Sequence, residues 1–205
     1  MPRTVDEPHR WALLDRIVDY VHAHGVAELS LRPLAKAVKS SPRVLLYYFN
    51  SKEDLLAAVV ARARERQRRL FERLRIQDDD SAVDVCRAVW SIMSSPKAEP
   101  AFRLFFEFYG LALQDPKRYA AFLRDAVNEW LVFIEQPYGR AGYSRDDARA
   151  LATVVLAGYR GFMLDLCATH ERSRIDRAVD LWLNALGALP APNEIRKRRE
   201  GPTAS

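Results

Sequence analysis

The sequence is poor in the residues that build metal sites and disulfide frameworks, with two cysteines and four histidines among 205 residues. Cys86 and Cys167 lie far apart and lack a C-x-x-C spacing, so neither a disulfide framework nor a zinc site is indicated. His22 and His24 are two residues apart and point to different sides of a helix, which argues against a shared metal ion. We therefore expect no metal and no cofactor.

Signatures of catalysis and of membrane insertion are also missing from the sequence. It contains no Gly-rich phosphate loop, no G-x-S-x-G and no cysteine-histidine signature, so no nucleophile can be nominated. No run reaches the roughly 18–20 uncharged residues of a membrane span, and the N-terminal MPRTVDEPHRW is too polar for a secretion signal. The sequence predicts a cytoplasmic protein that is not an enzyme and has no membrane partner; a small-molecule-binding enzyme is a remote alternative.

Positive charge is concentrated in the first third of the chain. Residues 1–75 hold 15 Lys/Arg against 9 Asp/Glu, residues 76–189 hold 13 against 16, and residues 190–205 hold 4 against 2. A basic N-terminal part favours contact with an anionic polymer, although an ordinary solvated surface has the same composition. The arginines from Arg62 to Arg75 are spread around one expected helix, so we expect them to form a solvated face.

Apolar residues spaced by three and four predict an all-α fold, because no segment alternates strictly enough for a sheet. The first helix is expected over residues 8–24, ended by a glycine. Ser30 and Ser41 are expected to cap two short helices that meet at a tight turn, and Ser51 to begin a long fourth helix that runs to about Arg75. Five further helices are expected near 81–94, 98–113, 116–136, 145–170 and 174–188, with breaks at Pro96, Pro116, residues 137–139 and residues 171–173.

The third expected helix is short and rich in aromatic side chains. Leu45 and Phe49 are four residues apart, so they share a face that must be buried. The positions left to project outward are Arg43, Val44, Tyr47 and Tyr48. Arginine and tyrosine hydrogen-bond phosphates and base edges, while Val44 or Pro42 can touch a thymine methyl group. This pattern favours a DNA recognition helix; the alternative is that LLYYF forms an aromatic core between helices.

The stretch LSLRPLAKAVKSSPRVLLYYFNSKEDLL, residues 29–56, resembles the helix-turn-helix of the TetR family of transcriptional regulators. The resemblance covers about residues 11–60 at motif level. In it Leu46 replaces the usual tyrosine, Tyr48 replaces the usual histidine, and Lys39 stands where a glycine is frequent. The DNA-contacting residues that we predict on this basis are Ser30, Arg32, Lys39, Ser41, Pro42, Arg43, Val44, Tyr47, Tyr48 and Lys52.

The resemblance also implies an organisation and a mode of action. It implies a helix-turn-helix domain at residues 1–51, a connecting helix at 52–77 and a ligand-binding and dimerisation domain at 78–189, before a disordered basic tail at 190–205. The expected protein is a homodimeric repressor that binds a near-palindromic double-stranded DNA operator and is released by a small apolar or aromatic effector. An activator, or a DNA-binding regulator that needs no ligand, is the alternative.

The last two expected helices carry more apolar surface than one side of a small domain requires. Gly158 and Gly161 each cost about 1 kcal/mol of helix stability relative to alanine, so we expect them to permit close approach of another backbone. The resemblance implies pairing of these helices with a second copy. The predicted interface residues are Gly158, Gly161, Val179, Trp182, Leu183 and Leu186, and simple packing within one chain is the alternative.

Aromatic side chains crowd the middle of the chain, where they could line a ligand pocket with a few polar anchors. Glu107 has Arg103 four residues before it, so the two are expected to pair. Asp165 has no basic residue three or four positions away, and it could anchor a ligand, bond across the dimer or face water. The predicted ligand-binding residues are Cys86, Trp90, Phe105, Tyr109, Trp130, Phe133, Tyr159, Phe162 and Asp165.

Overall fold

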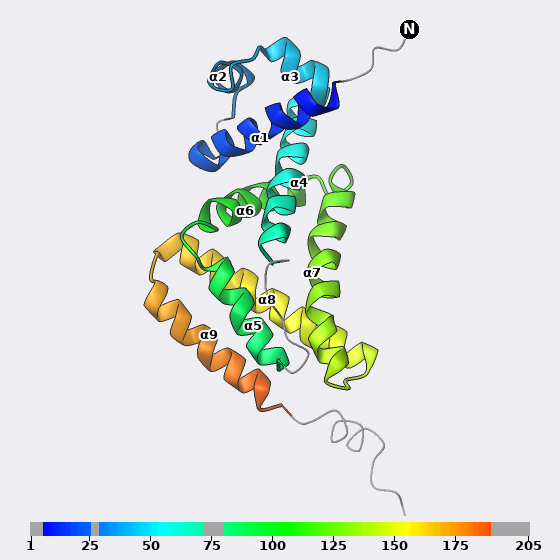
Figure 1. Ribbon diagram of the computed structural model, residues 1–205, viewed down its shortest axis with the longest axis vertical. Coiled ribbons are helices and arrows are strands. Elements are labelled where there is room, and N and C mark those ends of the chain that lie inside the picture. The colour runs from blue at the N-terminus through cyan, green and yellow to red at the C-terminus, as the bar shows by residue number, and fades with distance from the viewer. Residues whose placement is uncertain (1–5, 26–28, 72–79, 190–205) are drawn as a thin grey trace, which may run out of the picture. The chain divides into compact units, whose positions relative to one another are not determined.

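The computed structural model describes residues 6–25, 29–71 and 80–189, and within these ranges it contains nine helices and no strand (Figure 1). The all-α prediction is confirmed. The helices are α1 Glu7–His24, α2 Leu31–Ala37, α3 Pro42–Phe49, α4 Lys52–Phe71, α5 Ala82–Met93, α6 Glu99–Gln114, α7 Ala120–Arg140, α8 Arg145–Thr169 and α9 Arg172–Gly187. The predicted tail at 190–205 lies outside the described residues.

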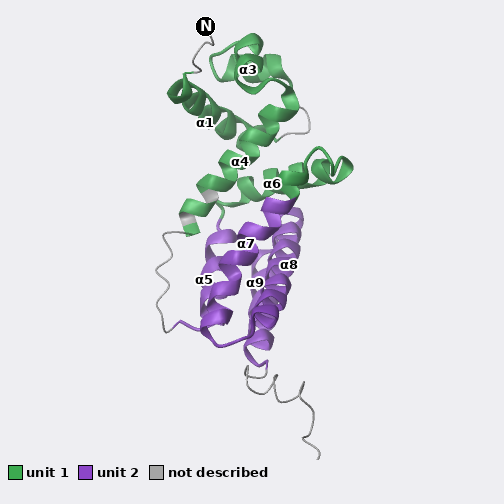
Figure 2. Cartoon of the chain, turned by 90° about the vertical axis from the view of Figure 1, so that its right-hand side faces the viewer, with its two compact units in different colours: residues 1–73, 96–123 green, residues 74–95, 124–205 purple. Residues whose placement is uncertain are grey.

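The chain divides into two compact units (Figure 2). The first unit comprises residues 1–73 and 96–123, and therefore contains α1 to α4, α6 and the start of α7. The second comprises residues 74–95 and 124–205, with α5, most of α7, α8 and α9. The expected domain boundary lies after residue 77. In the structure α6, which follows that position in the chain, belongs to the first unit because it packs against α1 and α4.

The helix starts were predicted from capping side chains. The Ser41 hydroxyl accepts a hydrogen bond from the Val44 N–H at 3.3 Å, and the Ser51 hydroxyl accepts one from the Asp54 N–H at 3.0 Å, so both predicted caps are confirmed. Ser30 occupies the N-cap position of α2, but its side chain makes no capping hydrogen bond to the described residues. The start of α2 instead has Pro33 in its first turn, where a missing N–H costs little.

The break predicted at residues 137–139 is wrong, because α7 continues through Pro137 to Arg140. Pro137 has no N–H to donate to the Phe133 carbonyl, so α7 continues past it with one helical hydrogen bond fewer. Pro137 and Tyr138 are buried, so packing holds this turn in place. The true break before α9 falls at His170, which adopts the left-handed conformation with φ 57°.

The first unit has one continuous apolar core to which α1, α2, α3, α4 and α6 all contribute. Each of these five helices contributes at least one side chain with no exposed surface: Leu13, Ile17, Leu34, Leu45, Val59 and Phe108 lie at 0% exposure. A recognition helix as short as α3 could not hold its conformation alone. Its two buried side chains, Leu45 and Phe49, anchor it in this shared core.

Four charged side chains join α1 to α4, and we call Asp15, Asp19, Arg62 and Arg66 the α1–α4 clamp. Arg62 donates to both carboxylate oxygens of Asp15, at 2.7 and 3.0 Å. Arg66 donates to Asp15 at 2.9 Å and to Asp19 at 2.6 Å. The hydrogen bonds from Arg62 hold the pKa of the Asp15 carboxyl below its usual value, so the pair stays ionised. The prediction that these arginines form a solvated face is therefore wrong for Arg62 and Arg66, which bind carboxylates of α1.

The second unit packs α5, α8 and α9 around the buried side chain of Tyr159. The Tyr159 hydroxyl donates a 2.6 Å hydrogen bond to the backbone carbonyl oxygen of Cys86 on α5. Trp90, Phe162 and Trp182 surround it, and their ring centroids lie 5.4 to 6.3 Å from their nearest aromatic neighbours in this cluster. Burial raises the pKa of Tyr159, so its phenol remains protonated and keeps the hydrogen bond.

One described helix, α8, is long and apolar enough to cross a membrane by length and composition alone. Core helices of soluble proteins pass the same test. On α8 the buried side chains, among them Val155, Tyr159 and Met163, pack inside the second unit.

Candidate nucleic-acid interface

The turn between α2 and α3 is a helix C-terminal motif with an unusual residue in it. The Ser40 N–H bonds to the Ala35 carbonyl at 2.8 Å and the Lys39 N–H bonds to the Lys36 carbonyl at 3.2 Å, which is the Schellman pattern. Lys39 takes the left-handed position of that motif, with φ 54°. Glycine is favoured there because a Cβ atom is strained by about 1 kcal/mol. The chain keeps an exposed lysine at this strained position.

Helix α3 has a buried side and an exposed side. Leu45 and Phe49 are buried in the core of the first unit, and Val44 and Tyr48 pack against that core as half-buried flanks. The exposed residues on the opposite side are Arg43, Leu46, Tyr47 and Asn50, which we call the α3 exposed face. At 100° per residue these four positions fall within one arc of about 100°, so they form a continuous surface.

The structure therefore corrects the expected orientation of α3. Val44 and Tyr48, predicted to project outward, are turned partly toward the core, whereas Leu46 and Asn50 were missed. Leu46 is 40% exposed and Tyr47 is 49% exposed. The helical period could not have separated them from Val44 and Tyr48, since at 100° per residue Leu46 and Tyr48 lie equally far from the centre of the buried pair, as do Asn50 and Val44. The alternative of an aromatic core between helices fits two of the five LLYYF side chains, the buried Leu45 and Phe49.

Aromatic and cationic contacts fix α3 on α1. The Tyr48 ring lies 5.9 Å from the His9 ring and 5.1 Å from the Tyr47 ring, measured between centroids. The Arg10 guanidinium lies over the Phe49 ring, 5.5 Å from its centroid. These contacts hold the exposed tyrosine from behind, which limits the conformational entropy that it loses when it meets a partner.

One basic side chain, Arg43, belongs to the α3 exposed face. Three more lie in the elements before and after α3 in the sequence: Arg32 on α2, Lys39 in the turn and Lys52 at the start of α4. None of the four forms an ion pair with another residue in the part of the chain that the structure describes. Cations without an internal partner remain available for phosphate groups. Of the other predicted DNA-contacting residues, Ser30 and Ser41 are exposed and Pro42 is half-buried.

The predicted ligand-binding residues are distributed over both units. Phe105 and Tyr109 lie in the first unit, on α6, where their ring centroids are 6.3 and 6.1 Å from that of Phe122. The rest lie in the second unit, where Cys86, Trp90, Tyr159 and Phe162 belong to the core around Tyr159, and Trp130 packs edge-to-face on Phe133 along α7.

Asp165 has a charged partner that sequence spacing did not reveal. Arg174 donates to its two carboxylate oxygens at 3.0 and 2.8 Å, across the connection between α8 and α9. These hydrogen bonds hold the pKa of the Asp165 carboxyl below its usual value. The partner is nine residues away, so a search at three and four positions within one helix could not find it. Asp165 thus fastens the two C-terminal helices of the same chain.

Four of the predicted interface residues are used within the second unit. Val179 and Leu183 are buried in its core, and Trp182 belongs to the aromatic cluster. A Cβ atom on Gly158 would lie 2.4 Å from Cζ2 of Trp182, so Gly158 makes room for an indole of its own chain. Val179 and Leu183 fit the packing alternative because they are buried inside the unit, whereas Trp182 and Gly158 are half-buried. Leu186 is half-buried on the same helix.

Gly161 lies on a different, exposed side of α8. Exposed apolar residues there recur at alternating intervals of four and three, and we call them the outer α8 stripe: Ala150, Val154, Ala157, Gly161, Leu164 and Ala168. Leu164 is 54% exposed, and Leu181 on α9 is 68% exposed. This interval is that of a helix which packs lengthwise against another helix.

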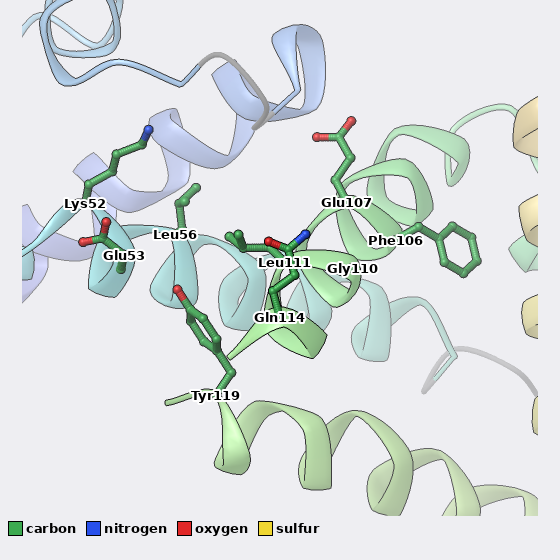
Figure 3. Close-up of a pocket in the computed structure, with 9 residues that line it drawn as sticks. All are labelled: Lys52, Glu53, Leu56, Phe106, Glu107, Gly110, Leu111, Gln114 and Tyr119. Carbon is green, nitrogen blue, oxygen red and sulfur yellow. The ribbon is translucent and has the colours of Figure 1, made fainter. Parts of the chain in front are cut away.

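A cleft of about 560 Å³ lies in the first unit between the start of α4 and α6 (Figure 3). Leu56 of α4 faces Leu111 and Gln114 of α6, and Tyr119 lies on one side of the cleft. Its other lining residues are Lys52, Glu53, Phe106, Glu107 and Gly110. Sequence reasoning missed this cleft because its walls come from separate helices. It also paired Glu107 with Arg103, whereas Arg103 donates to Glu99 at 2.8 Å.

Comparison with known proteins agrees with this geometry. The family model described as "Bacterial regulatory proteins, tetR family" matches residues 13–59. No curated protein sequence matches the chain. A putative TetR-family transcriptional regulator from Rhodococcus sp. has a similar structure, with a TM-score of 0.68 and 20% identity over 86% of this chain and 99% of that one.

Two further solved structures are informative about the fold. The multidrug binding protein EbrR, complexed with imidazole, has a TM-score of 0.68 at 21% identity, covering 93% of this chain and 96% of that one. BioQ, solved with its natural double-stranded DNA operator, has a TM-score of 0.55 at 20% identity, covering 86% of this chain and 98% of that one. The matched segment, residues 13–59, identifies the N-terminal helix-turn-helix as a DNA-binding domain of the type found in the tetR family of bacterial regulatory proteins, and the solved structures share the fold of most of the chain.

Proposed function

We propose that the protein is a transcriptional repressor that binds a near-palindromic double-stranded DNA operator as a homodimer in the cytoplasm. The observation that carries the proposal is the α3 exposed face, a solvent-facing Arg-Leu-Tyr-Asn surface, together with cations on α2, the turn, α3 and α4 that form no ion pair with the described residues. In a helix-turn-helix the second helix enters the major groove and the flanking cations meet phosphates. The structure of BioQ with its operator shows that a related fold accommodates DNA.

The phosphate contacts predict a salt dependence. Four cations per chain, doubled in a homodimer, give about eight neutralised phosphates if all of them bind. The logarithm of the association constant would then fall with the logarithm of salt concentration with a slope of about −7. Base-edge contacts from α3 add sequence specificity to this nonspecific term.

The test is selection of bound sequences from random duplex DNA by the purified protein, repeated across salt concentrations. An enriched inverted repeat is expected, and Arg43→Ala/Tyr47→Ala should lose it while keeping the wild-type melting temperature, because both side chains are exposed. Arg145→Ala, an exposed arginine at the start of α8, is the charge-matched control and should keep the repeat. Binding without sequence preference at every salt concentration contradicts the proposal.

We place the dimer contact on the outer α8 stripe together with Leu181 of α9. A second copy laid along this surface would cover leucines that are now 54% and 68% exposed. It would also account for the apolar composition of α8, since one side packs inside the unit and the other against the partner. Sedimentation should show a dimer at micromolar concentration for the wild type and a monomer for Leu164→Asp. Leu113→Asp, at a 56% exposed leucine on α6, should stay dimeric.

We place the effector in the cleft between α4 and α6 rather than at the aromatic core residues, most of which pack against one another. A volume of about 560 Å³ suits a small organic molecule, and Leu56, Phe106 and Leu111 offer apolar contacts. Lys52 belongs both to this cleft and to the predicted DNA-contacting residues. A ligand that binds here and prefers a different position of α4 would lower operator affinity.

The effector site can be tested with a library of small aromatic compounds and a labelled operator. Gly110→Phe would place an aromatic ring at the cleft, because Gly110 lines it and no atom lies within 4 Å of a Cβ at this position. This variant should bind the operator as the wild type does but no longer respond to a compound that releases the wild type. Gly139→Phe, also open and outside the cleft, is the control. A releasing compound that acts equally on Gly110→Phe contradicts this site.

A further inference from the structure

Leu46 is an apolar residue in a surface otherwise made of polar and charged groups. On the helix it neighbours Arg43, three positions earlier, and Asn50, four positions later. All three are exposed, and Leu46 keeps 40% of its surface open to solvent. The other leucine of α3, Leu45, has no exposed surface and anchors the helix. Leu46 is therefore not needed to hold α3 in the core.

The chemistry of the major groove limits what an exposed leucine can meet there. Base edges present hydrogen-bond donors and acceptors to the groove, and the C5-methyl group of thymine is their apolar group. A leucine pressed against donors and acceptors would strip them of water without replacing their hydrogen bonds, which is unfavourable. A leucine pressed against a thymine methyl removes apolar surface from water, which is favourable.

We propose that Leu46 is a specificity-determining residue that selects thymine at one fixed position of each operator half-site by contact with its methyl group. The inference rests on the proposed DNA-binding function. Val44 and Pro42, which the sequence offered for this contact, are half-buried, and Val44 packs against the core of the first unit. The neighbouring Asn50 and Arg43 carry the side chains that pair with adenine and guanine edges. Leu46 supplies the apolar contact that these two cannot make.

Uracil provides the test, because it differs from thymine only by the missing methyl group and pairs in the same way. Each thymine of the selected operator is replaced by uracil in both half-sites, and operator affinity is measured for wild type, Leu46→Ala and Leu46→Met. Burial of about one methyl group predicts a loss of about fourfold per half-site for the wild type at one position, or about fifteenfold for both. Leu46→Met keeps an apolar contact of similar volume and should keep the uracil sensitivity.

The decisive result is the coupling between residue and methyl group. In Leu46→Ala the thymine and uracil operators should bind equally well, whereas Leu113→Ala, an exposed leucine on α6, should behave as the wild type. The inference is overturned if uracil weakens binding equally for wild type and Leu46→Ala, or if no thymine of the operator is sensitive to uracil. In either case an enriched inverted repeat would still support the proposed function. If no sequence is enriched, the proposed function fails and this inference with it.

Discussion

Two glycines three residues apart on α8 should respond to alanine in opposite ways. A Cβ atom at Gly158 would lie 2.4, 2.6 and 2.9 Å from Cζ2, Cη2 and Cε2 of Trp182, closer than real contacts allow. The indole cannot retreat freely, because the rings of Tyr159 and Phe162 pack on it with centroids 5.7 and 5.4 Å away. At Gly161 no atom lies within 4 Å of the added carbon.

The magnitudes follow from two competing terms. Overpacking of a core costs about 1–3 kcal/mol, while replacing a helical glycine with alanine gains about 1 kcal/mol. Gly158→Ala should therefore lower the free energy of unfolding by up to about 2 kcal/mol. Gly161→Ala should raise it by up to about 1 kcal/mol, because only the second term applies. For a chain of this size each kcal/mol shifts the melting temperature by about 2–4 °C.

Thermal and urea unfolding followed by circular dichroism measure both changes, at one protein concentration and in the Leu164→Asp background, so that dimerisation does not contribute. A double-mutant cycle identifies the cause. Trp182→Phe replaces the indole with a smaller ring and removes the fused benzene ring, which contains all three colliding atoms, so Gly158→Ala should cost less in that background. A Gly158→Ala variant as stable as the wild type refutes a steric overlap with Trp182. So does a loss of stability that is unchanged in the Trp182→Phe background.

Three further substitutions test other contacts. Lys39→Gly should leave the melting temperature unchanged or slightly raised, because relief of the left-handed strain offsets the greater entropy of the unfolded chain, while the salt slope of operator binding should shrink by about 1 per chain. Asp15→Asn should destabilise the protein by on the order of 1 kcal/mol at neutral pH, since it weakens the bond to Arg62. Because the pKa of Asp15 is lower in the folded state, this loss of stability is full above about pH 5 and vanishes as the pH falls through the folded-state pKa. Urea unfolding of both proteins across this pH range measures the difference. Tyr159→Phe should cost about 0.5–1.5 kcal/mol in urea unfolding, because it removes one hydrogen bond to the Cys86 carbonyl, which keeps its bond within α5; an unchanged midpoint contradicts the role of the Tyr159 bond.

Features set by neighbours in the sequence were predictable. The helix starts at Ser41 and Ser51 and the buried pair Leu45 and Phe49 depend on contacts within one or two turns, and the structure contains them. The DNA-binding segment was recognised because its capping residues, turn and apolar spacing all fall within about thirty residues. Its exposed side could not have been derived from the same period, because Leu46 and Tyr48 lie equally far from the buried pair, and only packing against the rest of the unit decides which of them is exposed.

Features set by contacts between distant helices were not predictable. Arg62 meets Asp15 across 47 positions, and Arg174 meets Asp165 across nine, so neither pair appears in helical spacing. The use of Gly158 was missed for the same reason, since the indole that fills its space belongs to α9. A glycine within a helix indicates close approach, but it does not tell whether the approaching group belongs to the same chain.

The α1–α4 clamp has a mechanical consequence. Its carboxylates lie on two successive turns of α1 and its guanidinium groups on two successive turns of α4, so the two helices resist both sliding and rotation against each other. Because α3 contacts α1 through Tyr48 and Phe49, a displacement of α4 moves α1 and α3 with it as one rigid body. A small tilt of α4 therefore becomes a larger translation of Tyr47 and Leu46. In the homodimer proposed above, regulation would then need no refolding of α3, only a change in the distance between the two copies of this helix.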